Sequence, residues 1–188
     1  MGGILLLEDG RSFEGEAFGA RATRVGEIVF NTAMSGYQEV LTDPSYLEQI
    51  VAMTMPHVGN TGVNAEDVES SAIHAAGFVA RQFSRQYSNY RANAGLDQYL
   101  RAGGVPGLHG IDTRALVRHI RSAGAMKAVI STDGTPAREL WARVEAWPGM
   151  EGRALAAEVC VAAPYVAHDP PAPRARVTVV DGGCKNNI

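Results

Sequence analysis

The sequence predicts a mixed α/β domain, and three observations support this. Short apolar and β-branched runs, each ended by glycine, proline or acidic turn residues, are typical of strands. Two segments, 112–123 and the one that follows Thr135-Pro136, place apolar residues at helical spacing. Hydrophobic residues make up 46% of the 188 residues and charged residues 20%, a composition that supports a buried core and excludes disorder.

The strands are expected mostly in the first part of the chain. Residues 4–7 form an apolar run that ends at Glu8-Asp9-Gly10, a turn sequence. Residues 13–18 alternate apolar with polar or small residues, which predicts the hairpin partner of the first strand. The other predicted strands are 26–31, 50–54, 77–81 and a later one that includes 129–130.

The clearest helix is expected at 112–123. Asp112 is a good N-cap residue, and Gly124 suits the position just after the C-terminus. One face of this helix carries Leu116, Ile120 and Ala123.

Two more helices are expected on either side of it. Residues 96–102 form a short one, and Thr135-Pro136 opens another with proline at its first position. Pro148-Gly149 ends this last helix. Its apolar face contains Leu140, Trp141, Val144 and Trp147.

The end of the chain predicts a domain boundary. The segment 161–175 is a linker, since it holds prolines at positions 164, 170, 171 and 173. It separates a domain at 1–160 from residues 176–188. There a β-branched run at 177–180 and the turn Asp181-Gly182-Gly183 are typical of a strand that opens a new α/β domain.

Composition excludes several classes of function. The net charge is −3, with 17 basic and 20 acidic residues well mixed, so no footprint for nucleic acid is present. The N-terminus has no basic region and only a four-residue apolar run, which argues against a signal peptide or a membrane span. The five histidines and two cysteines show no metal-ligand spacing, so we expect no metal site and two free thiols in the cytoplasm.

The densest polar segment, 31–46, is the main candidate for a site. Asp43-Pro44-Ser45 is turn chemistry, because Asp accepts from nearby backbone amides and Pro fixes φ. From chemistry alone a structural loop is favoured, with Ser45 capping a backbone group. The alternative is a loop that presents Ser45 to a small polar ligand.

Other motifs carry less chemistry. The glycine-containing loop 55–64 lacks a P-loop lysine, so a tight turn explains it better than phosphate binding. Cys184 lies in a turn without a partner histidine nearby, and His119 is expected to be a surface or satisfied residue. The residues alone therefore predict no complete active site.

Several ordered blocks resemble one family, the small subunit of glutamine-hydrolysing carbamoyl phosphate synthetase. The blocks cover nearly the whole chain. They are Gly26-Glu27, Phe30-Asn31-Thr32, Gly36 to Glu39, Leu41 to Tyr46, Pro56 to Gly62, Glu69-Ser70-Ser71, Gly110 to Leu116 and Asp181 to Ile188.

The resemblance implies an N-terminal domain of swivelling β/β/α type followed by a class I glutamine amidotransferase domain. That second domain would hydrolyse glutamine with a Cys-His-Glu triad beyond Ile188. The present chain would then hold no catalytic residue, and Cys184 would not be the nucleophile. Ammonia would pass by a tunnel to a large subunit, which uses ATP, Mg²⁺ and bicarbonate, so no cofactor is expected in this chain. The product feeds pyrimidine and arginine synthesis.

The resemblance also implies that Ser45 contributes to the glutamine pocket at the domain junction. Two alternatives stay open. The domain could be a non-catalytic interaction module that only docks on the large subunit, or the glutaminase half of a fused synthetase. A separate subunit is favoured over a fusion, because the chain reaches the family's first strand after a bare Met-Gly-Gly.

Overall fold

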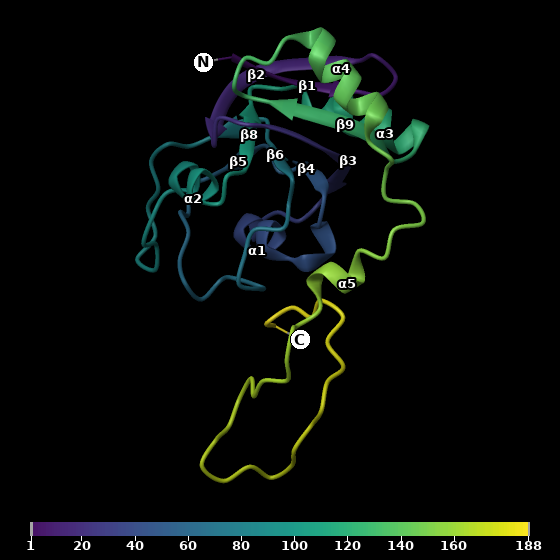
Figure 1. Cartoon of the computed structure of the whole chain (residues 1–188). Coiled ribbons are helices and arrows are strands. Elements are labelled where there is room, and N and C mark those ends of the chain that lie inside the picture. Colours follow the sequence, from purple (N-terminus) through teal and green to yellow (C-terminus); the bar gives the residue numbers. More distant parts are fainter. Residues whose placement is uncertain (1, 188) are drawn as a thin grey trace.

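The computed structural model describes residues 2–187, and its main feature is a closed barrel in the strand order β1-β2-β8-β6-β4-β3-β9 (Figure 1). The barrel strands are β1 (Gly2–Leu7), β2 (Ser12–Gly19), β3 (Thr23–Asn31), β4 (Gln49–Met53), β6 (Gly77–Val79), β8 (Pro106–His109) and β9 (Met126–Ser131). A separate two-stranded sheet pairs β5 (His57–Val58) with β7 (Gln82–Phe83). The predicted α/β class is confirmed.

The observed helices match the predicted ones where the sequence carries clear signals for a helix start or end. They are α1 (Tyr37–Thr42), the 3₁₀-helix η1 (Pro44–Tyr46), α2 (Leu96–Ala102), α3 (Thr113–Ala123), α4 (Ala137–Ala146) and α5 (Ala156–Val159). Asp112 caps α3 as predicted, accepting the Ala115 N–H at 3.0 Å. Leu116 and Ile120 of the predicted face are buried, whereas Ala123 is exposed.

The barrel mixes antiparallel and parallel pairs, and this decides where the polar segment lies. β3 pairs with β4 in parallel, as β4 does with β6 and β6 with β8. Parallel neighbours cannot be joined by a tight hairpin and need a crossover connection. The crossover from β3 to β4 contains α1 and η1, so the polar segment 31–46 is that connection.

The structure has three hydrophobic clusters, and alternating side chains of β4 contribute to two of them. Ile50 and Ala52 of β4 face the barrel interior, where α3 also packs. Val51 and Met53 face the other way, into a cluster that includes residues of α1 and α2. This period of two is the normal geometry of a strand buried on both faces. α1 is thus held on the outside of the barrel by apolar packing.

The sequence did not predict α1, β8, the 3₁₀-helix η1, α5 or the small β5–β7 sheet, and α1 and β8 show why. α1 has only six residues and begins after Gly36 without a side-chain cap, so no local start signal marks it. β8 contains Pro106 and Gly107, which are both unfavourable in strands. Proline is tolerated there because it occupies the first position of the strand.

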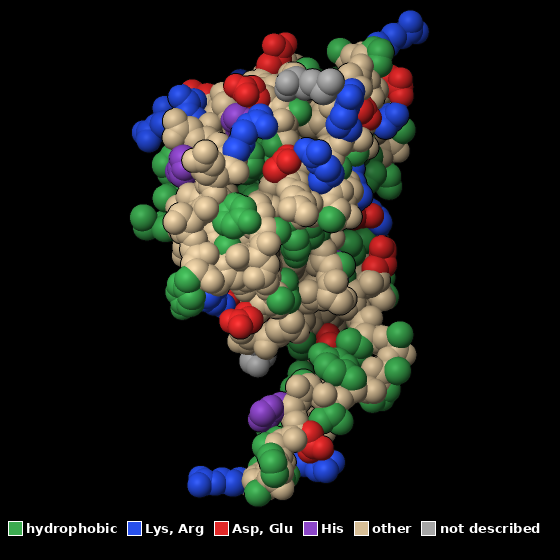
Figure 2. All heavy atoms as spheres, turned by 90° about the vertical axis from the view of Figure 1, so that its left-hand side faces the viewer, with side chains coloured by type: hydrophobic (Ala, Val, Ile, Leu, Met, Phe, Trp, Pro, Cys, Tyr) green, Lys and Arg blue, Asp and Glu red, His purple; other side chains and the backbone are tan. Residues whose placement is uncertain are grey.

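The predicted strand after the linker is not formed. Residues 161–180 carry no helix or strand, and they project from the domain body in Figures 1 and 2. Val177 and Val180 are 85% and 94% exposed, because no described segment offers these residues a partner strand. Ile188, the last residue of the predicted segment 176–188, lies outside the described residues. The division into 1–160, 161–175 and 176–188 stays a prediction.

Candidate functional site

Ser45 lies in η1, on the crossover between β3 and β4, with its side chain exposed. The predicted turn chemistry at Asp43-Pro44-Ser45 is confirmed, since Asp43 Oδ1 accepts the Ser45 N–H at 2.9 Å. Asp43, not Ser45, therefore caps the backbone here. This fixes the main chain of Ser45 and leaves its side chain at the surface. Contact of Ser45 with a ligand stays a prediction.

Asp43 is 6% exposed and uses both carboxylate oxygens. Oδ1 holds the backbone of Ser45, and Oδ2 lies 2.8 Å from Nζ of Lys185. Burial alone would raise the pKa of Asp43, but the hydrogen bonds from Lys185 and Ser45 outweigh it and hold that pKa below its ordinary value. Asp43 in turn raises the pKa of Lys185. Both groups therefore stay charged.

Buried Thr42 ties this turn to a second polar loop. Its Oγ1 donates to the Gln38 carbonyl at 2.9 Å and accepts the Glu69 N–H at 2.9 Å. Ser70 Oγ donates to the Thr42 carbonyl at 2.6 Å and lies 2.9 Å from Nε2 of His74. Burial lowers the pKa of His74, so the imidazole is neutral at pH 7.

Tyr37 and Gln38 connect α1 to the loop 55–64. The Tyr37 hydroxyl donates to the Gly62 carbonyl at 2.6 Å, and burial raises the pKa of that phenol. Gln38 donates to the Asn64 carbonyl at 2.6 Å and accepts the Asn64 N–H at 2.9 Å. Gly59 has φ 88°, which confirms the predicted use of glycine in a tight turn.

A carboxylate cluster beside this loop predicts acid sensitivity. Asp67 Oδ2 accepts from Asn64 Nδ2 at 2.7 Å, and Oδ1 lies 2.6 Å from Arg91. These contacts lower the pKa of Asp67, as Lys185 and Ser45 lower that of Asp43. A lowered folded-state pKa stabilises the fold above the unfolded value, and that stabilisation disappears as the pH falls through the folded value.

We therefore expect the stabilisation by these groups to be full and independent of pH above their ordinary pKa of 3.8, and the free energy of unfolding to fall as the pH drops below that value. Urea unfolding at pH steps from 6 to 2 measures this fall in stability. The slope of the unfolding free energy against pH should be smaller in Asp67→Asn than in the wild type. Glu66→Gln is the comparison, because that carboxylate pairs with the same Arg91 but its side chain is 79% exposed, so its removal should change the slope less. An equal slope in Asp67→Asn and the wild type would contradict the prediction.

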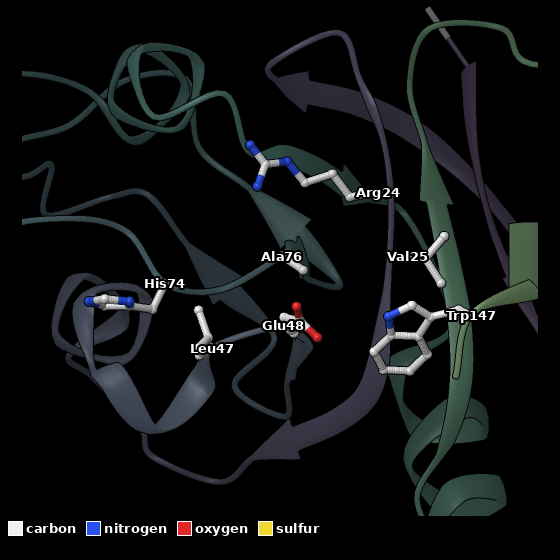
Figure 3. A pocket seen from close by; sticks show the side chains of 7 residues that line it. All are labelled: Arg24, Val25, Leu47, Glu48, His74, Ala76 and Trp147. Atoms are coloured by element: carbon white, nitrogen blue, oxygen red, sulfur yellow. The ribbon is translucent and has the colours of Figure 1, made fainter. Parts of the chain in front are cut away.

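A cavity of about 260 Å³ lies next to the Ser45 turn (Figure 3). Leu47 and Glu48 line it from the turn, and Trp147 closes the opposite side. Glu48 has φ 59° and forms an ion pair with Arg153, which attaches the segment before α5 to the turn. Of this ion pair only Glu48 lines the cavity, and Ser45 does not line it.

A second cavity, of about 490 Å³, lies between the end of β2 and α2. It is lined in part by Arg21, Arg85 and Arg101. Asp97, which also lines it, accepts the Gly19 N–H at 2.7 Å and pairs with Arg101 at 2.8 Å. No residue that the sequence predicts as functional lies in this cavity.

The remaining chemical candidates are not assembled into a site. Cys160 and Cys184 are both free thiols, as expected. Nε2 of His119 on α3 lies 2.7 Å from Oδ2 of Asp9 but is buried without a hydrogen-bond partner, so the prediction of a surface or satisfied residue is not confirmed. Within residues 2–187, His, Cys, Asp and Glu form no group of three that could bind a metal ion. None of the helices in that range has the length and hydropathy to cross a bilayer.

Comparison with known proteins identifies the family. Residues 5–130 match the family described as "Carbamoyl-phosphate synthase small chain, CPSase domain", so the chain belongs to it. The chain is 47% identical over 196 residues to the carbamoyl phosphate synthase small chain of Synechococcus sp., covering 98% of this chain and 50% of the relative. It is 50% identical over 184 residues to that of Streptomyces avermitilis, covering 97% and 48%. The chain spans about half the length of these curated relatives.

Among solved structures, an aminopeptidase from Aneurinibacillus sp. strain AM-1 superimposes with a TM-score of 0.41 at 15% identity, over 70% of this chain and 30% of that one. A likeness at this level carries no argument about function.

Proposed function

We propose that this chain is the N-terminal part of the glutaminase subunit of carbamoyl phosphate synthetase and that Ser45 contributes to its glutamine site. The observation that carries the proposal is an exposed hydroxyl on a fixed turn, beside which the segment 181–187 returns to the domain. Family membership supports the subunit, and the place of Ser45 in the matching block supports the site.

The proposal includes the finer features that the resemblance implies. The barrel domain is of the swivelling β/β/α type and precedes a class I glutamine amidotransferase domain, which holds the catalytic triad. Ammonia released there passes to the large subunit, the partner that uses bicarbonate, ATP and Mg²⁺. The assembly works in the cytoplasm and supplies carbamoyl phosphate for pyrimidine and arginine synthesis.

In this arrangement the present chain binds substrate and supplies no nucleophile. A serine hydroxyl both donates and accepts hydrogen bonds, so it suits the ammonium and carboxylate groups of an amino acid. Asp43 holds the backbone of Ser45 at 2.9 Å, which limits the entropy lost when the hydroxyl engages the ligand. A loop of one domain that completes a pocket on its neighbour is a common type of ligand site.

Ser45→Ala in the full-length subunit tests the proposal. We expect kcat/KM for glutamine to fall about tenfold, the effect of one hydrogen bond to a charged group. Carbamoyl phosphate synthesis from free ammonia and the melting temperature should not change, because the side chain is exposed. Ser35→Ala, at an exposed serine of the same crossover, is the matched control. Unchanged glutamine kinetics in Ser45→Ala would contradict the glutamine site.

The second candidate is the interaction module, in which the domain only docks on the large subunit. Met34 and Tyr90 are 79% and 97% exposed and are available for such a contact, although single exposed apolar side chains are common on protein surfaces. Co-purification of Ser45→Ala with the large subunit, together with unchanged glutamine kinetics, would support the module instead.

A further inference from the structure

The segment 181–187, here called the return segment, comes back to the barrel domain after a long exposed stretch. Residues 171–180 are all exposed, whereas Asp181, Gly183 and Cys184 are half-buried. In Figure 1 the C-terminal segment runs away from the body and turns back to end near α5. A proline-rich linker without helix or strand cannot by itself impose this return. Contacts between the return segment and the domain must therefore hold it.

A turn within the return segment prepares these contacts. Asp181 Oδ1 accepts the N–H groups of Gly183 and Cys184 at 2.8 and 2.7 Å. A Cβ atom on Gly183 would lie 2.6 Å from Val159 and 3.3 Å from Pro44, so a side chain would not fit there. The turn thus packs directly against the residue that precedes Ser45.

Glu69 makes the strongest contact with the return segment. Its carboxylate is 7% exposed and accepts from Asn187 twice, from the backbone N–H at 3.1 Å and from Nδ2 at 3.0 Å. The Glu69 carbonyl accepts the Asn186 N–H at 2.8 Å, and the Val68 carbonyl accepts from Asn186 Nδ2 at 3.0 Å. A buried carboxylate requires such donors, because leaving it unpaired is costly.

Asp43 makes the second contact and reaches Ser45 directly. The Asp43 carboxylate accepts the Ser45 N–H at Oδ1 and forms an ion pair with Lys185 at Oδ2. Thr42 joins the two anchor points, since its hydroxyl accepts the Glu69 N–H at 2.9 Å. The backbone of Ser45 is therefore connected to the return segment through two buried carboxylates.

We propose that Glu69 and Asp43 are positioning residues that hold the return segment against the Ser45 turn, so that Ser45 has a fixed place relative to the chain that follows. The inference rests on the proposed function for its catalytic consequence only. If Ser45 binds glutamine in a pocket shared with the next domain, releasing the return segment lowers the fraction of molecules in which that pocket is complete. The apparent affinity for glutamine falls by the same fraction.

The two anchors should not contribute equally. Lys185, whose side chain is 43% exposed, makes one contact with the domain, to Asp43, whereas Asn186 and Asn187 together donate four hydrogen bonds to residues 68 and 69. Glu69 is buried and bound at both oxygens. Loss of the Glu69–Asn187 contact should therefore release the return segment, whereas loss of the Lys185 ammonium alone should have a small effect.

Cleavage by endoproteinase Lys-C measures this release in the present chain, because lysine occurs only at Lys127 and Lys185. Lys127 lies in barrel strand β9 and is protected in the folded protein, so cleavage of the native chain reports on Lys185. We expect Asn187→Ala and Glu69→Gln to increase the cleavage rate about tenfold, while the melting temperature stays within a few degrees. Glu66→Gln, at an exposed carboxylate on the same loop, and Val180→Ala, at a 94% exposed residue just before the return segment, are the controls and should match the wild type.

Equal rates in the wild type, Asn187→Ala and Glu69→Gln would overturn the inference, as would wild-type cleavage as fast as that of a free peptide of the same sequence. This outcome does not depend on glutamine. A normal effect of Ser45→Ala combined with equal Lys-C rates would remove the inference and leave the proposed function in place. Faster cleavage of Asn187→Ala and Glu69→Gln combined with unchanged glutamine kinetics of Ser45→Ala would support the anchoring of the return segment and contradict the proposed glutamine site.

A double-mutant cycle in the full-length subunit tests the positioning role. Asn187→Ala should raise KM for glutamine about fivefold or more and leave ammonia-dependent synthesis unchanged. In the Ser45→Ala background the same change should have almost no effect, because both act through one contact. An equal increase of KM in both backgrounds would show that the return segment does not act through Ser45 and would overturn this role.

Discussion

Phe78→Ala is expected to lower the free energy of unfolding by about 3–5 kcal/mol, the largest effect of any single truncation that we predict. Phe78 lies in β6 and is fully buried in the cluster that joins the barrel to α1 and α2. Its ring meets that of Phe18 edge to face at 6.4 Å between centroids. Truncation removes this contact and leaves a cavity that β6, paired on both sides, cannot close.

Urea unfolding followed by tryptophan fluorescence measures the loss. Domains of this size have a total stability of about 5–15 kcal/mol, so the variant should be close to unfolding at 37 °C. Tyr90→Ala is the control, because its side chain is 97% exposed and should change stability by no more than about 0.5 kcal/mol. A loss below about 1 kcal/mol in Phe78→Ala would mean that β6 does not lie in the core.

The sequence predicted best the elements whose signals are local. α2 was predicted at its observed bounds, and α3 was located from its cap and from the spacing of Leu116 and Ile120. A cap and an amphipathic stripe lie within a few residues of each other, so neighbouring sequence is enough to place them. The short apolar strands β1 and β4 were located for the same reason.

Closure of the barrel could not be predicted in this way. It depends on pairs such as β1 with β9 and β2 with β8, which lie about a hundred residues apart. The same limit explains α1, whose short helix is formed by packing on the barrel and by Tyr37 and Gln38 rather than by a start signal. Tertiary contacts override weak local propensity in such segments.

For the candidate site, turn chemistry predicted the contact of Asp43 with Ser45, but the role of Ser45 came only from the family resemblance. The contacts of Glu69 with Asn187 join residues 118 positions apart, and no spacing rule predicts them. One signal was available. Asp43 and Lys185 have opposite charges and stand in two blocks that resemble the same family, but opposite charge alone does not select this pair among 17 basic and 20 acidic residues.

Gln38→Leu is expected to lower the free energy of unfolding by about 2–4 kcal/mol and to loosen the loop 55–64. Gln38 is 3% exposed, and its amide satisfies both the N–H and the carbonyl of Asn64. Leucine fills a similar volume but leaves these two backbone groups without partners. An unpaired group costs about 1–3 kcal/mol when it is fully buried, and although Asn64 is half-buried, the cost of its two unpaired groups, not the lost packing, dominates the change.

Hydrogen exchange separates this mechanism from a general loss of stability. The Asn64 amide should exchange at least tenfold faster in Gln38→Leu under native conditions, while amides of β4 keep their protection relative to global unfolding. Gln98→Leu, at an exposed position of α2, is the matched control. It should change neither the exchange rate of the Asn64 amide nor the protection of the β4 amides. If the Asn64 amide kept its protection in Gln38→Leu, water would have replaced the side chain, and the loop would not depend on Gln38. Because Asn64 also donates to Asp67, a loosened loop should in addition reduce the acid sensitivity that Asp67 contributes.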